Sequence, residues 1–287
     1  MSDGESTVRT RELGIALRTA VAVTGMNNAE LAHRMGWSPS KVTNLFKGKR
    51  GAIDTDVAAI LALCGIKGPE RDRLMGLARQ PHGPGWWQEH GNRLPEETRT
   101  LINHEDAAVA ITSFQSVVIP GLLQTADYIR ARMRSSAIVA DEEIEQRVAA
   151  RLHRQRILER RPPMPFRFFI DEHALRRIGP GRAIMSEQVH HLLRLSVRRN
   201  IEIRAVPDAA GFHIGVNPFH LMEFAEFGPV VFVEDLTSAL FHERADTIAA
   251  YRRVVADLAR VALTEGQSRE WIVRLATELG ESPEGAP

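Results

Sequence analysis

The first 80 residues repeat one pattern, in which apolar side chains recur every three and four positions, as in short amphipathic helices. The first apolar stripe consists of Leu13, Ala16, Leu17, Ala20 and Val21. Gly25 then supplies the left-handed residue that commonly ends a helix. The same spacing predicts further helices over 28–35, 39–47, 54–64 and 69–79. We therefore expect five short helices in residues 1–80.

The second and third of these helices carry clear start and stop signals. Asn27 precedes the second helix and Glu30 follows three residues later, which is the spacing of a capping box. Ser38 stands where the third helix needs an N-cap, and Pro39 fits its first position because that position needs no N–H donor. Gly36 lies between the two helices. Two short capped helices joined by a tight turn with glycine predict a helix-turn-helix.

The third helix divides into an apolar face and a polar face. Val42, Leu45 and Phe46 share the side that we expect to be buried, and Trp37 can pack on Val42 as a hydrophobic staple. The outward side chains are Ser40, Lys41, Thr43, Asn44 and Lys47. Residues 38–50 contain no acidic side chain, whereas a helix that is merely solvated usually mixes glutamate with lysine. The pattern favours a DNA-reading helix over a plain basic surface helix.

Each polar residue type suits a known kind of DNA contact. An asparagine such as Asn44 can bind adenine through two hydrogen bonds, and Lys41 or Lys47 can bind guanine. The N-terminus of the helix, with Ser38 and Ser40, suits a phosphate. The candidate DNA-binding residues are Asn28, Ser38, Ser40, Lys41, Thr43, Asn44, Lys47, Lys49 and Arg50.

Beyond residue 80 the pattern changes twice. Residues 81–97 are rich in glycine, proline and tryptophan and predict a connector, in which Trp86 and Trp87 anchor the chain or, less simply, form a ligand cage. Helices are expected over 98–110, 124–134, 141–160, 183–198, 242–264 and 268–280. Short apolar or alternating segments predict strands at 166–171, 201–207, 219–224 and 230–235. The fold class is multidomain: an all-α helix-turn-helix domain (1–80), the connector, and an α+β domain (98–287) with a short, mostly antiparallel sheet.

Residues 141–161 form a second basic feature. Arg147, Arg151 and Arg154 share one face of the predicted helix, and the apolar residues Ile144, Val148 and Leu152 lie on another. This face can bind an acidic partner protein or track DNA phosphates. It can also be a solvated surface whose arginines pair with acids elsewhere in the fold.

Composition narrows the class of protein further. The formal net charge is +1, so a nucleic-acid footprint must be local. The single cysteine, Cys64, excludes an intrachain disulfide and is typical of a reducing compartment. The chain has no signal-peptide pattern and no apolar run near the ~18 residues of a membrane span. We expect a cytoplasmic protein that associates with the nucleoid.

The sequence gives little sign of catalysis. It contains no Walker A loop, no G-x-S-x-G elbow and no H-E-x-x-H pair. Convergence of His213, His220, His242 and Asp171 in the fold is conceivable, but their spacing does not indicate it. Glu234 and Asp235 follow a strand without a partner nucleophile or base. We expect no enzyme activity, no metal and no cofactor.

Two sets of motifs resemble known families. The segment from Leu13 to Ile66, with MNNAELAHRMGWSPSKVTNLFKGKR at its centre, is similar to Xre-type (phage repressor-like) helix-turn-helix domains. It departs from them at Asn28 and Asn44, where those domains more often carry glutamine and arginine, so we expect an unusual operator. The motifs VVIPGLLQTADYIRA, FIDEHALRR and VVFVEDLTSALF resemble the C-terminal domain of actinobacterial WhiJ-like regulators.

The resemblance implies a DNA-binding regulator, antitoxin-like, whose C-terminal domain binds a small partner protein encoded by an adjacent gene. Arg147, Arg151 and Arg154 are our candidates for that contact. Repressor-like domains of this class usually read two half-sites as dimers, so a homodimer on double-stranded DNA is expected. The alternative is a ligand-sensing repressor with a small-molecule pocket in the C-terminal domain.

Overall fold

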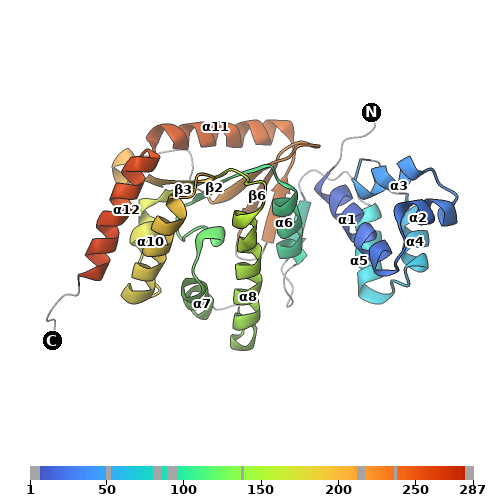
Figure 1. Cartoon of the computed structure of the whole chain (residues 1–287), viewed down its shortest axis with the longest axis horizontal. Helices are drawn as coiled ribbons and strands as arrows, with labels where there is room; N and C mark the ends of the chain where they lie inside the picture. Colours follow the sequence, from blue (N-terminus) through green and yellow to red (C-terminus); the bar gives the residue numbers. More distant parts are fainter. Residues whose placement is uncertain are drawn as a thin grey trace.

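The computed structural model describes residues 7–49, 53–79, 86–89, 96–136, 139–211, 217–235 and 238–281. A helical N-terminal domain is followed by a larger α+β domain (Figure 1). The N-terminal helices are α1 (Val8–Val23), α2 (Asn28–Met35), α3 (Pro39–Phe46), α4 (Asp54–Leu63) and α5 (Gly68–Arg79). The five predicted helices and the helix-turn-helix are confirmed.

The apolar stripes of these helices meet in one small core. Every helix contributes side chains that are almost fully buried, among them Leu13, Leu17, Leu31, Val42, Val57, Ile60, Leu61 and Leu74. Burial of a side chain of this size stabilises a fold by about 1.5–3 kcal/mol. The periodicity of the sequence therefore fixes which face of each helix turns inward, and with it which face of α3 turns outward.

The C-terminal domain alternates strands and helices. Its strands are β1 (Trp86–Glu89), β2 (Ala110–Gln115), β3 (Phe166–Asp171), β4 (Ile201–Val206), β5 (Phe219–Glu223), β6 (Val230–Glu234) and β7 (Ser238–His242). Its helices are α6 (Glu96–Ala107), α7 (Ala126–Arg134), α8 (Ile144–Arg154), α9 (Glu172–Arg176), α10 (Arg182–Ser196), α11 (Ala245–Val261) and α12 (Glu265–Gly280). Within the described ranges, no helix has both the length and the apolar character needed to cross a bilayer.

The strands form one sheet in the order β1-β7-β6-β5-β2-β3-β4. β2, β3 and β4 are parallel neighbours, and the other neighbours are antiparallel. The prediction of a short sheet was wrong: in the described part of the chain the sheet is long, it mixes two parallel neighbour pairs with four antiparallel ones, and it includes three strands that the sequence did not reveal, β1, β2 and β7. Parallel strands need long crossover connections, which the helices between β2, β3 and β4 provide.

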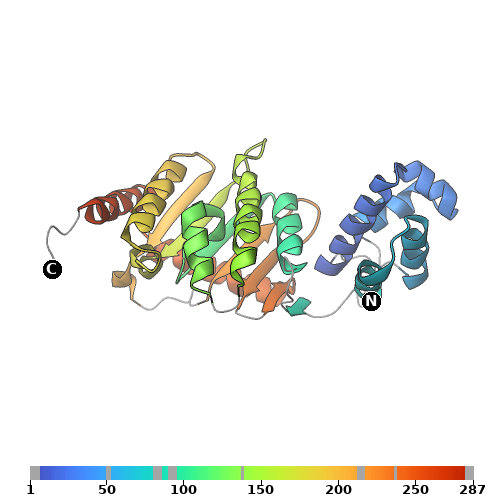
Figure 2. The same ribbon diagram turned by 90° about the horizontal axis from the view of Figure 1, so that it is seen from below.

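Each face of this sheet packs against its own layer of helices. Figure 1 shows α11 across one face, where Phe114, Phe169 and Phe219 form a core with Ile248 and Leu258. The opposite face carries α6, α7, α8 and α10, which lie side by side in Figure 2. Its buried side chains include Ile111, Phe168, Ile203, Met222, Phe232 and Phe241. Alternate residues of each strand thus serve two different cores, as period-two geometry requires.

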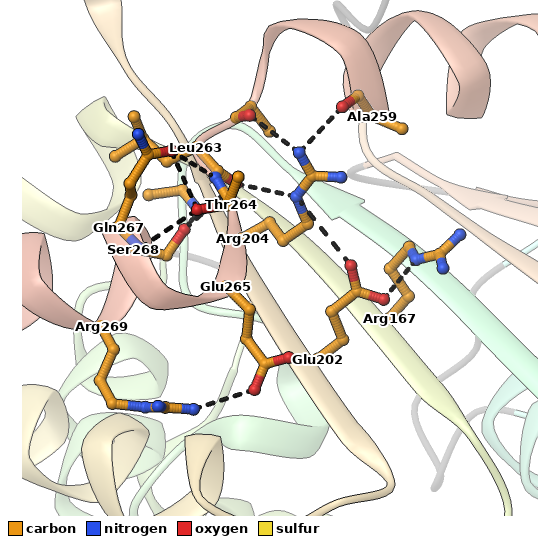
Figure 3. Close-up of polar contacts among 12 residues, drawn as sticks. Arg167, Glu202, Arg204, Ala259, Leu263, Thr264, Glu265, Gln267, Ser268 and Arg269 are labelled. Atoms are coloured by element: carbon orange, nitrogen blue, oxygen red, sulfur yellow. Dashed lines mark hydrogen bonds and ion pairs between the residues drawn. The ribbon is translucent and has the colours of Figure 1, made fainter.

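The corner between α11 and α12 closes the β4 edge of the sheet (Figure 3). The Arg204 guanidinium of β4 donates hydrogen bonds to the carbonyl oxygens of Ala259, Ala262 and Leu263, each at 2.8 Å. The backbone N–H of Ala205 donates to the Ser268 hydroxyl at 3.0 Å. Exposed strand edges invite pairing with other chains, and these contacts cover this one.

Candidate DNA-reading surface and its neighbours

Local chemistry fixes where α2 and α3 begin and end. The Asn27 side chain accepts a hydrogen bond from the Glu30 N–H at 2.9 Å, and the Glu30 carboxylate accepts one from the Asn27 N–H at 3.3 Å. Gly36 ends α2 with φ at 65°, in the left-handed region. The Ser38 hydroxyl then accepts from the Lys41 N–H at 3.2 Å, and Pro39 is the first residue of α3. The predicted caps are confirmed.

Two glycines let α3 approach α1 closely. A Cβ atom on Gly14 would lie 2.5 Å from the Phe46 carbonyl oxygen, and one on Gly48 would lie 2.7 Å from the Arg11 backbone nitrogen. Gly48 also has a φ of 65°, and its carbonyl oxygen accepts a hydrogen bond from the Thr10 hydroxyl at 2.9 Å. These backbone contacts hold the C-terminal end of α3 against the start of α1.

The outward face of α3 is polar, as predicted. Val42, Leu45 and Phe46 are buried, while the exposed side chains are Ser40, Thr43, Asn44 and Lys47. The Thr43 hydroxyl donates to the Pro39 carbonyl at 3.0 Å, and the Ser38 and Ser40 hydroxyls lie 3.0 Å apart. Among the described residues, no hydrogen bond engages the Asn44 amide. Asn44 is therefore the α3 side chain most available to a base edge.

Lys41 has partners that the sequence did not reveal. Its Nζ lies 2.7 Å from the Asp56 carboxylate of α4 and 3.8 Å from the centre of the Trp37 ring. The absence of acids from residues 38–50 is thus offset by an acid on the next helix. A guanine contact by Lys41 remains a prediction, and it requires this ion pair to exchange for the base.

The remaining predicted DNA contacts flank α3. Asn28 is exposed at the first position of α2. Lys47 and Lys49 follow α3 at its C-terminal end, and both approach Glu226 of the C-terminal domain. Arg50 lies outside the described residues. The structure thus brings Asn28, Ser38 and Ser40 near the N-termini of α2 and α3, where backbone N–H groups favour phosphate.

The three arginines of α8 have different surroundings. Arg147 pairs with Glu143 at 2.8 Å along the same helix. Arg154 reaches the buried Glu105 of α6 through two hydrogen bonds of 2.5 and 2.7 Å. Arg151 has no ion pair among the described residues, and burial, followed by the positive charge of Arg132, lowers its pKa to about 10. Of the three predicted contact residues, Arg147 and Arg154 are already in ion pairs, so Arg151 is the one whose charge a new partner can neutralise.

Buried polar groups surround the Arg154–Glu105 pair. Burial, followed by nearby arginines, lowers the pKa of His220 and of His104 to about 3. His220 faces Ser113 across neighbouring strands. Among the described residues, His220 Nδ1 and the Ser113 hydroxyl have no hydrogen-bond partner, and no cluster of histidine, cysteine and carboxylate side chains has the arrangement of a metal site. His213, one of the histidines named above, lies outside these residues.

Comparison with known protein families assigns both parts of the chain. Residues 12–74 match the model described as "Helix-turn-helix domain". Residues 98–274, more than half of the chain, match "Domain of unknown function (DUF5753)". The chain therefore belongs to the DUF5753 family, with a helix-turn-helix domain in front.

Other comparisons add little to this assignment. None of the curated proteins matches the chain. One solved structure, described as "Structure of TrmBL2, an archaeal chromatin protein, shows a novel mode of DNA binding", aligns with a TM-score of 0.30 and 10% identity. The alignment covers 85% of this chain and 91% of that one. A likeness of this size carries no conclusion about function.

Proposed function

We propose that the chain is a sequence-specific, DNA-binding transcriptional regulator that inserts α3 into the major groove. The observation that carries the proposal is the outward face of α3, which presents Ser40, Thr43 and Asn44 on a helix held rigidly by its caps and by α1. Helix-turn-helix proteins place the second helix of the pair in the major groove, with its outward side chains on base edges. The N-termini of α2 and α3 then bind flanking phosphates and set the register. The expected homodimer would read two half-sites.

Replacing Asn44 with alanine tests this assignment. We expect the variant to lose discrimination at one base position by about 1–3 kcal/mol, because a two-point amide–adenine contact disappears. Anisotropy titrations against a duplex selected by the wild-type chain, and against that duplex changed at single positions, measure the loss. Asn217→Ala is the matched control, since Asn217 is exposed in the other domain. Equal discrimination by the Asn44→Ala variant and the wild-type chain would remove α3 from the reading role.

The proposal also includes an antitoxin-like role, in which the C-terminal domain binds a small protein encoded by an adjacent gene. Arg151 favours it: a largely buried guanidinium without an ion pair in the described structure, close to further arginines, suits an acidic side chain of a partner. Catalysis is no part of the proposal, because the sequence offers no nucleophile with a matching base.

A substitution at Arg151 tests the partner contact. We expect Arg151→Ala to weaken binding of the small protein by about thirtyfold or more, since truncation of one member of a desolvated charge pair costs at least ~2 kcal/mol. Calorimetric titration of the neighbouring gene product into the full chain measures it. Arg156→Ala is the control, because Arg156 is an exposed arginine just past α8. An unchanged affinity in Arg151→Ala would place the contact elsewhere.

The ligand-sensing alternative remains a second candidate. His220 Nδ1 and the Ser113 hydroxyl are the buried polar atoms that a ligand in the C-terminal domain would engage, because buried polar groups are almost always hydrogen-bonded. A hollow of about 370 Å³ lies instead beside the helix-turn-helix domain, between α1 and α5, with Asn103 of α6 at its rim. The ligand-sensing alternative therefore requires a molecule that forms hydrogen bonds with His220 Nδ1 and the Ser113 hydroxyl, away from this hollow.

A further inference from the structure

The turn between β5 and β6 extends from the C-terminal domain to the end of α3. Its Glu226 carboxylate lies 3.2 Å from Lys47 Nζ and 3.7 Å from Lys49 Nζ. All three side chains are about half exposed, at 51%, 45% and 41% respectively. In Figure 1 this end of the sheet is the one that faces α1 and α3. The two lysines that follow the predicted reading helix therefore meet a carboxylate from the other domain.

A firmer contact beside Glu226 holds the turn in place. The guanidinium of Arg11, a buried residue of α1, donates a hydrogen bond to the Glu243 carboxylate at 2.7 Å and lies 4.0 Å from the Phe227 ring centre. The same Glu243 oxygen accepts a hydrogen bond from the Val8 N–H at 2.7 Å. Phe227 in turn packs on Phe224, with ring centres 4.2 Å apart. The buried contact positions the turn, and the exposed one lies where DNA is expected.

A carboxylate and a phosphate oxygen are alternative partners for the same ammonium group. Hydrogen bonding to Lys47, followed by the charges of Lys47 and Lys49, lowers the pKa of Glu226, so its carboxylate is ionised at neutral pH. When α3 enters the major groove, residues just past its end come close to the DNA backbone. Glu226 would then place a negative charge beside that backbone and keep the two lysines from it.

We propose that the β5–β6 turn is an autoinhibitory element, in which Glu226 competes with DNA phosphate for Lys47 and Lys49. This inference rests on the proposed DNA-binding function. It adds that the C-terminal domain lowers DNA affinity through a defined contact, and that any event that displaces the turn raises it. If the ion pair of Glu226 with the two lysines did not compete with DNA, removing the Glu226 charge would leave DNA affinity unchanged.

The test compares Glu226→Gln with the wild-type chain, both at full length. The glutamine keeps the size of the side chain and removes its charge. We expect the duplex selected by the wild-type chain to bind about two- to fivefold more tightly, the range expected for loss of an exposed ion pair. The gain should shrink as salt rises, because salt screens exposed charges. Phe227→Ala, which removes the ring beneath Arg11 and loosens the turn, should shift affinity in the same direction.

Glu142→Gln is the matched control. Glu142 is an exposed glutamate just before α8, so its change alters net charge by the same amount. Equal tightening in both glutamine variants would reduce the effect to net charge and overturn the inference. Unchanged or weaker binding in Glu226→Gln, with Asn44→Ala still defective, would overturn the inference and leave the proposed function standing. Failure of the wild-type chain to select any duplex would sink both.

Discussion

Replacing Glu105 with alanine is expected to lower the free energy of unfolding by about 3–5 kcal/mol. Glu105 is buried on α6 and accepts both hydrogen bonds of the Arg154 guanidinium, so its removal leaves a desolvated cation without a partner. Burial raises the pKa of Glu105 while the Arg154 charge opposes the rise. The pair joins α6 to α8 across the sheet face, and its loss should loosen that whole layer.

Denaturant unfolding of Glu105→Ala and of the double variant Glu105→Leu with Arg154→Met measures this effect. Because apolar side chains of similar volume often replace a buried ion pair without loss, the double variant should regain most of the stability. A change below about 1 kcal/mol in Glu105→Ala would mean that water reaches Arg154 and compensates its charge.

Acidification from pH 7 to pH 5 is expected to destabilise the fold by about 2 kcal/mol for each of His104 and His220. Burial lowers the pKa of both imidazoles from the usual histidine value of 6.5 to about 3. In the unfolded chain the two histidines therefore bind protons as the pH falls through 6.5, whereas in the folded chain they stay neutral until about pH 3. The free energy of unfolding is therefore unaffected by these two histidines above pH 6.5, and it decreases as the pH falls from 6.5 toward 3.

Unfolding free energies at several pH values show the number of protons taken up on unfolding. We expect about one proton per histidine near pH 5. His104→Asn and His220→Asn should each lower the number of protons taken up on unfolding by about one. A pH dependence that is identical in His220→Asn and the wild-type chain would place the titration at other groups.

Local sequence signals predicted the N-terminal domain well. The caps at Asn27 and Ser38, the stop at Gly36 and the buried face of α3 depend on residues within four positions of one another, so they can be read directly. The sheet was harder to predict. β2 joins β5 and β3, whose residues lie far along the chain, and its first residue, Ala110, falls within the helix predicted over 98–110. Strand pairing of this kind depends on long-range contacts that a local pattern does not contain.

The same reason explains what the sequence missed in the site. The acidic partners of Lys47 and Arg154 are 179 and 49 residues away, so the spacing of residues could not identify them. Lys41 likewise pairs with Asp56 on the next helix. The residue types along α3 were enough to predict its polar face correctly. The acidic partners of Lys41 and Lys47 could be identified only from the tertiary fold.

If α3 reads DNA sequence, the chain must bind a specific duplex more tightly than other DNA, and the ratio of the two affinities is the decisive quantity. The measurement selects a duplex from a randomised pool with the full-length chain, then titrates that duplex and a shuffled copy at several salt concentrations. We expect the chain to bind the selected duplex about a thousandfold more tightly, or more, than the shuffled one at physiological salt, with affinity for both falling as salt rises. Equal affinity for the selected and shuffled duplexes at every salt concentration would contradict it.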